Sequence, residues 1–153
     1  MRLSTRARYA LRMMLDIAKN GVAGNPVSLA DVAERTDLSK GYLEQLATNL
    51  RSHQLIRGVA GKRGGYRLTR PPEAISLREI IEAAIGKVSI LECLEEPSTC
   101  MRTDVCECRM VYALINYKIT QVLDEFSLAD LQNPRLRVEV QRQLDGFPRE
   151  ERH

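Results

Sequence analysis

All four cysteines of this 153-residue chain lie within residues 93–108, with the spacing C-x6-C-x5-C-x-C. They are Cys93, Cys100, Cys106 and Cys108. Thiolates at such intervals on an irregular loop can converge on a soft metal ion, and iron–sulfur clusters are held mainly by cysteine. Structural zinc sites usually carry C-x2-C pairs, which are absent here. The spacing favours an iron–sulfur cluster, while a thiol switch, another metal or inert cysteines stay open as alternatives.

A long helical pattern follows the cysteines and must position them. Residues 87–107 are irregular and contain Pro97 and the acidic residues Glu92, Glu95 and Glu96, whereas residues from about 108 to 126 repeat apolar side chains at helical intervals. The apolar set is Met110, Val111, Leu114, Ile115, Tyr117, Ile119, Val122, Leu123 and Phe126. So broad a surface can serve its own domain and a second copy of the chain. We therefore predict a homodimer paired through this helix.

The stretch from Ser28 to Thr69 predicts two short helices followed by a hairpin. Ser28 stands three residues before Asp31, which is the spacing of a helix-capping box. The second helix is predicted to open at Ser39 and to bury one face. That face is Leu43, Leu46, Ala47 and Leu50. The strand-like runs L-I-R-G-V and Y-R-L-T then flank the glycine-rich tip A-G-K-R-G-G. This order is that of a winged helix-turn-helix.

The polar side of the second helix is suited to double-stranded DNA. In the major groove, glutamate can accept a hydrogen bond from cytosine and glutamine can pair with adenine, while basic residues contact phosphates. The candidate contacts are Glu44 and Gln45 for bases, and Lys40, Arg51, Lys62 and Arg63 for the DNA backbone or minor groove. The alternative is an ordinary packed helix with a solvated polar face.

Together these motifs resemble the Rrf2 family of bacterial winged-helix repressors. The resemblance rests on S-x-x-Y-L-E-Q-L over 39–46, R-x-x-x-L-I over 51–56, G-G-Y-R-L over 64–68 and the opening M-R-L-S-T-R-A-R-Y-A, and it runs from residue 1 to about residue 131. It implies a DNA-binding regulator, and it adds Ser39 and Tyr42 to the candidate DNA contacts.

The cluster-binding branch of that family includes an iron–sulfur cluster regulator and a nitric-oxide-responsive repressor, and it carries three cysteines just before the long helix. Cys93, Cys100 and Cys106 match them, with a first gap one residue longer than expected. The resemblance thus implies a 2Fe–2S or 4Fe–4S cluster on these residues. It does not supply a fourth ligand, because Arg109 stands where some relatives have a histidine and Arg8 where others use an acidic residue of the partner subunit.

Cys108 is the leading candidate for the fourth ligand, ahead of Glu107, Asp104 and a residue of the partner subunit. If the long helix starts after Cys108, its thiolate can turn toward the same centre as that of Cys106. If the helix starts earlier, side chains two residues apart diverge. A small buried apolar role for Cys108 is the alternative.

Charge divides the chain into two halves. Residues 1–70 carry 13 Lys and Arg against 5 Asp and Glu, while residues 71–153 carry 10 against 15. A net charge of +8 beside −5 fits a DNA-binding half joined to a sensing and pairing half, although basic surfaces also occur without nucleic acid. We find neither a signal-type apolar core nor an apolar run long enough to span a membrane. A cytoplasmic protein is therefore expected, and a disulfide framework in so short a loop is not.

The remaining segments are predicted to be helical. A first helix runs from Thr5 to about Lys19 with a buried stripe, and a capping box at Ser76 and Glu79 opens another helix that ends at Gly86. The stripe is Ala7, Leu11, Met14 and Ala18, widened by Ala10 and Ile17; the later helix buries Leu77, Ile80, Ile81, Ala84 and Ile85. Leu136, Val140 and Leu144 mark a terminal helix, and residues 146–153 a loose tail.

The sequence thus predicts a mainly α fold: a winged helix-turn-helix with a small β-hairpin wing and a long C-terminal dimerisation helix. We divide it into a DNA-binding region (1–72), a sensor loop with dimerisation helices (73–131), and a terminal helix and tail (132–153). The expected function is a homodimeric repressor of a palindromic operator, controlled by an iron–sulfur cluster that senses redox state, nitric oxide or cluster supply. A cluster-free regulator answering a thiol oxidant or small molecule, and a small electron carrier, are the alternatives. No catalytic constellation is found, so an enzyme is not expected.

Overall fold

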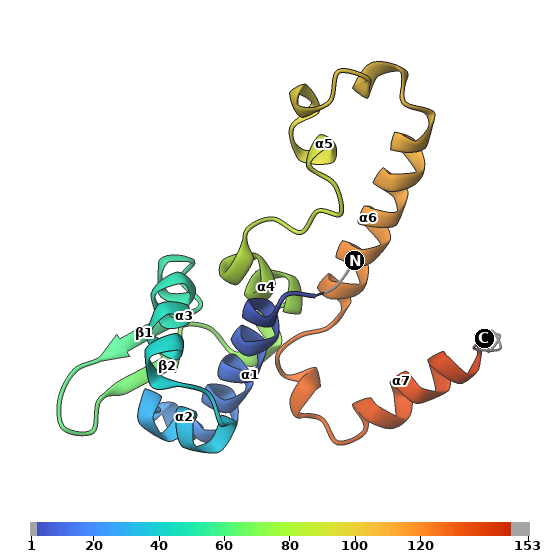
Figure 1. Cartoon of the computed structure of the whole chain (residues 1–153). Coiled ribbons are helices and arrows are strands. Elements are labelled where there is room, and N and C mark those ends of the chain that lie inside the picture. The colour runs from blue at the N-terminus through green and yellow to red at the C-terminus, as the bar shows by residue number, and fades with distance from the viewer. Residues whose placement is uncertain (1–2, 148–153) are drawn as a thin grey trace.

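Three helices and a small sheet build the N-terminal part of the computed structural model, which describes residues 3–147 (Figure 1). α1 (Thr5–Asn20) begins after Ser4, whose hydroxyl accepts a hydrogen bond from the Ala7 N–H at 3.1 Å. The helix and its cap are as predicted, but the buried stripe is shifted. Its members are Ala7, Ala10, Met13, Met14 and Ile17. Leu11 and Ala18 lie at the edge of the core, because α1 packs against α4 as well as against the helix-turn-helix.

The helix-turn-helix consists of α2 (Leu29–Thr36) and α3 (Lys40–Ser52). The Ser28 hydroxyl accepts from the Asp31 N–H at 3.1 Å, and a left-handed Asp37 (φ 56°) ends α2, which allows the sharp turn into α3. All four residues predicted for the buried face of α3 are fully buried. The helix ends at Ser52. His53 is the C-terminal cap, with its backbone N–H directed at the Asn49 carbonyl at 3.2 Å.

The wing is an antiparallel pair of strands, β1 (Ile56–Val59) and β2 (Gly65–Leu68), in which Ile56 lies opposite Leu68. Val27 adds a third strand position, since its backbone exchanges two hydrogen bonds of 2.8 Å with Tyr66. A β-carbon on Gly65 would collide with the Val27 carbonyl oxygen. The close backbone approach expected of this glycine-rich segment is therefore made by Gly65 within the protein itself.

α4 (Leu77–Ile85) carries the predicted capping box, in which the Ser76 hydroxyl and the Glu79 carboxylate each accept a backbone N–H. Its inner side completes the core with Ile80, Ile81 and Ala84. The expectation that Ile85 is buried was wrong: its exposed fraction is 43%. Ile85 is the last residue of α4, and Gly86 ends the helix.

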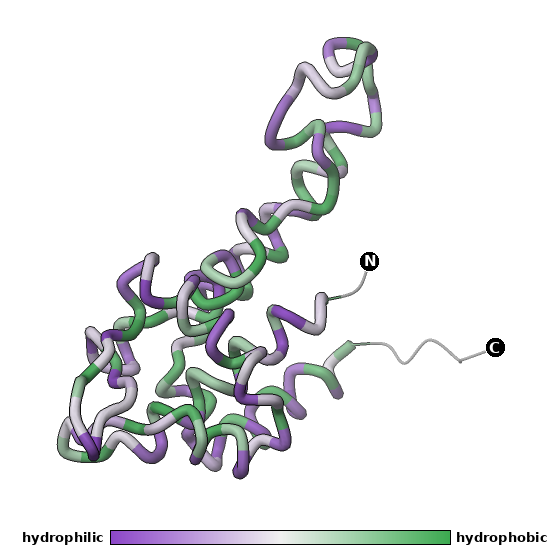
Figure 2. Tube along the Cα trace, turned by 60° about the vertical axis from the view of Figure 1, so that its left-hand side comes forward, coloured by the Kyte–Doolittle hydropathy of each residue, from purple (hydrophilic) through white to green (hydrophobic). Residues whose placement is uncertain are grey.

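Beyond Gly86 the chain leaves this core and forms an arm, residues 87–125, that stands away from it (Figures 1 and 2). The arm contains the short helix α5 (Glu92–Glu95), 3-10 turns at Pro97–Thr99 and Thr103–Val105, and the long α6 (Glu107–Glu125). The irregular sensor loop and the long helix are thus as predicted, with α6 starting one residue earlier.

The chain re-enters the core directly after the arm. Ser76 and Ser127 form an isolated bridge, the Leu77 N–H donates to the Phe126 carbonyl at 2.9 Å, and Leu128 is fully buried. We call residues 3–86 together with 126–133 the body.

The C-terminal end is α7 (Leu136–Asp145), which matches the predicted terminal helix, after a 3-10 turn at Asp130–Gln132. Residues 148–153 of the predicted loose tail lie outside the described residues. Among the helices described, none is long and apolar enough to cross a membrane.

Candidate DNA-binding surface and cysteine loop

The outward side of α3 presents the predicted DNA contacts on a rigid support. Lys40, Glu44, Gln45 and Arg51 are exposed, while the opposite side of the helix is sealed in the core. Lys40 Nζ lies 4.0 Å from Glu44 Oε1, and both side chains are well exposed, so solvent screens this pair and leaves each free to rearrange. The helix can therefore offer two polar side chains and two cations to a groove.

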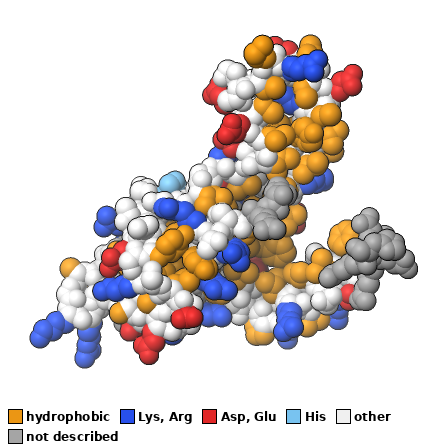
Figure 3. All heavy atoms as spheres, in the orientation of Figure 1, with side chains coloured by type: hydrophobic (Ala, Val, Ile, Leu, Met, Phe, Trp, Pro, Cys, Tyr) orange, Lys and Arg blue, Asp and Glu red, His pale blue; other side chains and the backbone are white. Residues whose placement is uncertain are grey.

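The wing tip adds two more cations. Lys62 and Arg63 are both exposed in the turn between β1 and β2, where Gly61 adopts a φ of +112°. Basic side chains project from the free end of the hairpin in the space-filling view (Figure 3). Their distance from the core leaves them open to a second molecule.

Ser39 and Tyr42 are engaged within the body. The Ser39 hydroxyl accepts from the Tyr42 N–H at 3.2 Å and so caps α3. The half-buried Tyr42 ring meets the Tyr9 ring edge to face, with 5.7 Å between centroids. Ser39 fixes the first turn of α3 and Tyr42 packs that turn against α1, which orients any contact made by the first turn.

The four cysteines all lie in the arm, at its far end from the body, and all are free thiols. Cys93 is half-buried in α5, and Arg109 Nε and Nη2 each lie 3.4 Å from its carbonyl oxygen. Cys106 is the N-terminal cap residue of α6, while Cys100 is exposed in the loop between them. Arg109 therefore ties the segment of Cys93 to the first turn of the long helix.

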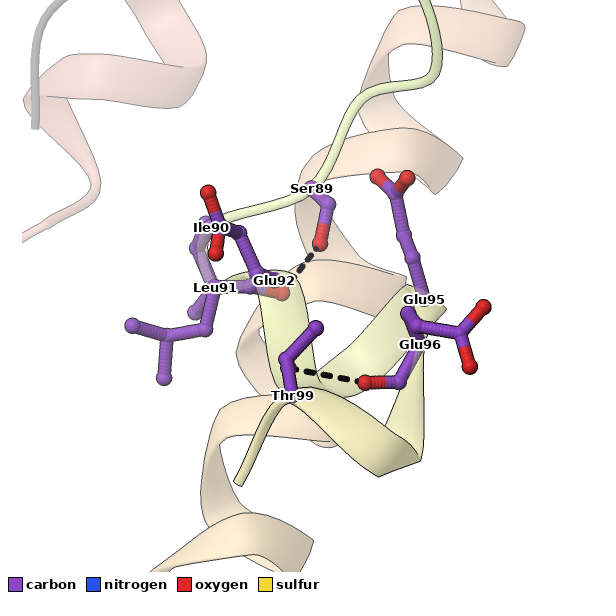
Figure 4. Close-up of a pocket in the computed structure, with 7 residues that line it drawn as sticks. All are labelled: Ser89, Ile90, Leu91, Glu92, Glu95, Glu96 and Thr99. Atoms are coloured by element: carbon purple, nitrogen blue, oxygen red, sulfur yellow. Dashed lines mark hydrogen bonds between the residues drawn. The ribbon is translucent and has the colours of Figure 1, made fainter.

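The structure does not assemble the thiols into a metal site within the described residues. Among residues 3–147, no group of three or more His, Cys, Asp and Glu side chains is close enough to hold a metal ion. The acidic residues beside Cys93 do not converge either. Glu92, Glu95 and Glu96 surround a hollow of about 370 Å³ between Ser89 and Thr99, and their carboxylates point in different directions (Figure 4).

The start of α6 does not favour Cys108 as the fourth ligand. α6 begins at Glu107, so Cys108 is an exposed residue of its first turn and its side chain diverges from that of Cys106. Its exposure also removes the alternative of a buried apolar role within one chain. Its part as the fourth ligand stays a prediction.

The chemistry of the donor set fits an iron–sulfur cluster. Cys106 stands at the start of α6, where no side chain caps the free N–H groups, so the helix dipole favours negative charge at this end. Arg109 brings a positive charge to the same place. Cys93, Cys100 and Cys106 are the residues that would hold the cluster once the loop between them closes.

Sequence reasoning missed how the arm is held together. Asn116 of α6 accepts a hydrogen bond from the Ile90 N–H at 3.0 Å and donates to the Val88 carbonyl at 3.3 Å. The available signal was a lone asparagine within an apolar helical run. Asn116 therefore holds residues 87–91 against the long helix.

The family comparison settles what kind of protein this is. The Rrf2 model, described as an iron-dependent transcriptional regulator, matches residues 3–134. The chain belongs to the Rrf2 family. Its function is therefore that of a transcriptional regulator that binds DNA, and members of this family are not enzymes.

Three similar proteins place the chain within the Rrf2 family. An HTH-type transcriptional regulator of Azotobacter vinelandii is 38% identical, covering 97% of this chain and 92% of its own. The regulator IscR of Escherichia coli is 37% identical, covering 87% and 81%. The structure of CymR, described as the global cysteine regulator of B. subtilis, is 34% identical with a TM-score of 0.70 over 86% of this chain and 95% of that one. The winged-helix Rrf2 fold expected from the sequence is thus confirmed.

Proposed function

We propose that this Rrf2 regulator is a homodimeric repressor whose affinity for a palindromic operator is controlled by an iron–sulfur cluster on Cys93, Cys100 and Cys106. The observation that carries the proposal is that Cys106 stands at the uncapped start of α6 while Arg109, in the first turn of the same helix, reaches the Cys93 carbonyl oxygen at 3.4 Å. The description of the matching family as iron-dependent supports it. The cluster would supply an iron centre sensitive to redox state, nitric oxide or cluster supply.

The homodimer is supported by the arm. Within α6 only Thr120 is buried, and apolar side chains stay exposed along its length. They include Met110, Val111, Leu114, Ile115, Tyr117 and Val122. Such a face is covered when two copies pair, and a two-fold dimer places two α3 helices on successive major grooves. The space-filling view shows this apolar surface along the arm (Figure 3).

The proposed control passes through the base of the arm. Closure of the cysteine loop would fix the outer half of α6, and α6 is held to α4 because Arg78 donates to Glu82 at 3.1 Å and to Asp124 at 3.0 Å. A change in the pairing of two arms would therefore reorient the two bodies and their DNA-binding surfaces. We assign residues 1–72 to DNA binding, 73–131 to sensing and pairing, and 132–153 to a terminal extension, in a cytoplasmic protein.

The test is a set of single serine substitutions, reconstituted with iron and sulfide without oxygen. Cys93→Ser, Cys100→Ser and Cys106→Ser are each expected to lose the visible absorption and the bound iron and sulfide. Cys108→Ser tests the fourth ligand separately, because Cys108 lies in the first turn of α6, and an unaltered spectrum there moves the fourth ligand to another residue. Normal cluster content in the first three variants contradicts the proposed site.

A cluster-free thiol switch is the second candidate. It is favoured by the exposure of Cys100 and Cys108, whose thiols an oxidant can reach, and by the likeness to CymR, the cysteine regulator. Under this function, oxidant changes operator affinity in protein without iron, and mass spectrometry detects a modified or paired cysteine. If iron-free protein binds the operator equally before and after oxidation, the thiol switch is excluded. The electron-carrier alternative is not retained, because the family consists of transcriptional regulators.

A further inference from the structure

We propose that the wing holds a tetrahedral oxyanion, of the phosphate or sulfate type, between Arg57, Arg67 and Arg70. These arginines line a hollow of about 390 Å³ that lies between the sheet and the end of α1. The inference is independent of the cysteine loop and adds a site to the body. It rests on three features of the hollow: its charge, an unpaired donor and its shape.

Two of the three arginine charges that line the hollow are not neutralised within the described part of the chain. Arg57 and Arg67 are directly opposite each other in the register of β1 and β2, so their side chains leave the same side of the sheet. Like charges in this position destabilise an antiparallel pair. Neither arginine has an ion-pair partner among residues 3–147, and no acidic residue lines the hollow. An anion between them would remove the repulsion.

Arg67 has an unpaired donor. Its Nε is buried and has no hydrogen-bond partner within the described residues, while its Nη1 reaches the Gly24 carbonyl at 3.5 Å. A buried N–H of a charged group is costly to leave without an acceptor. Oxyanions bind two parallel N–H groups of the guanidinium fork, which a lysine cannot reproduce. Arg70 is already paired with Glu79 at 2.7 Å, so it would contribute charge at the rim rather than the main contact.

The shape of the hollow gives a small ligand room to approach. Gly21 and Gly24 lie on one side, and Pro71 and Pro72 on another. Nothing lies within 4 Å of the position that a β-carbon of Gly24 would take. The occupant is therefore a compact anion, either a phosphate of the DNA backbone or free phosphate or sulfate in solution.

Three full-length variants test the site. Arg57→Gln removes an exposed charge, and Arg67→Lys keeps the charge but removes the guanidinium fork. Arg137→Gln, on exposed α7, is the control for loss of one positive charge. Each is compared with the unchanged protein in thermal unfolding with potassium phosphate or sulfate against potassium chloride of equal ionic strength, and in operator binding over a range of chloride concentrations.

A free anion is the occupant if phosphate at about ten times its Kd raises the unfolding midpoint by roughly 3–6 °C in the unchanged protein and in Arg137→Gln, but not in Arg57→Gln or Arg67→Lys. A DNA phosphate is the occupant if phosphate and chloride act alike, while the slope of log affinity against log salt falls by roughly one unit in Arg57→Gln alone and Arg67→Lys lowers operator affinity without changing the slope. Equal behaviour of all four proteins in both measurements overturns the proposal.

Discussion

The body and the arm use the same apolar residue types with opposite outcomes. In the body, Met13, Leu46 and Ile80 are fully buried within a single chain. In α6, Met110 has an exposed fraction of 73% and Leu114 of 57%. The body closes its core because four helices and the wing surround it, whereas α6 has its own chain on only one side. A helical period therefore identifies an apolar face but does not say whether the same chain or a second copy covers it.

The largest effect is expected from a matched pair of leucine truncations. Leu46→Ala should lower the free energy of unfolding by about 2–5 kcal/mol at any protein concentration, because it leaves a cavity in a closed core. Leu114→Ala should change stability only where copies associate. Urea unfolding at two protein concentrations, at least tenfold apart, measures both. Equal, concentration-independent losses would remove the distinction between body and arm.

A charge on the arm should act on assembly rather than on folding. Leu114→Glu is expected to raise the dissociation constant of the dimer by roughly 30-fold or more, since a carboxylate would be buried in the interface. Val138→Glu on α7 is the control, because Val138 is equally exposed at 56% but lies outside the arm. Sedimentation equilibrium gives the constants. A dimer as tight as that of the control would place the interface elsewhere.

The two basic residues at the wing tip, which belongs to the body, are expected to contribute to DNA binding. Removing both tip charges, Lys62→Ala with Arg63→Ala, should flatten the slope of log operator affinity against log salt by roughly one to two units. The control removes two positive charges from the arm instead, Lys87→Ala with Arg102→Ala. If the control flattens the slope as much, the effect reflects net charge and the tip makes no phosphate contact.

A smaller effect is expected from a substitution at the junction between the body and the arm. Arg78 joins Glu82 of α4 to Asp124 of α6 and is about one-third exposed. Arg78→Met should therefore cost less than about 1 kcal/mol in unfolding free energy. It should, however, speed amide hydrogen exchange in the last turn of α6 while leaving α1 unchanged. Equal exchange in both proteins would show that backbone contacts alone hold the arm.

The smallest effect concerns pH at the point where the chain re-enters the body. The Ser127 backbone N–H and hydroxyl donate to Asp130 and lower the pKa of its carboxyl group below the ordinary value. Because the pKa is lower in the folded state, this stabilisation is complete above the unfolded pKa of about 3.9 and is lost as pH falls through the folded pKa. Asp130→Asn should flatten the fall in unfolding free energy below about pH 4. An unchanged pH profile would contradict this role.

Local sequence signals predicted the body well because its contacts follow from short-range patterns. Ser4, Ser28, Ser39 and Ser76 each cap the helix that the sequence placed after them. The errors concern the burial of individual side chains, which depends on how the helices pack and not on the local pattern alone. Met13 is fully buried although the predicted stripe left it out, and Ile85, the last residue of α4, is exposed.

The cysteine loop was predictable in position but not in geometry. Residue type and spacing place the thiols before a long helix, and the structure has them there. Spacing cannot say where the helix begins to within one residue, and that single residue decides the direction of Cys108. The arginine pair of the wing was likewise hidden, because it depends on which residues of two strands lie opposite each other.

The junction around Ser76 and Ser127 has a consequence for how such regulators diversify. Its bridge, with the Leu77 to Phe126 and Leu128 to Ile75 hydrogen bonds, brings the chain back beside the point where it departed. In topological terms the arm is an insertion with adjacent ends, and the entropy of closing such an insertion grows only slowly with its length. Arms of different length and chemistry can therefore be exchanged on one body. Replacement of the arm can therefore change the signal to which the regulator responds, while the body keeps its packing.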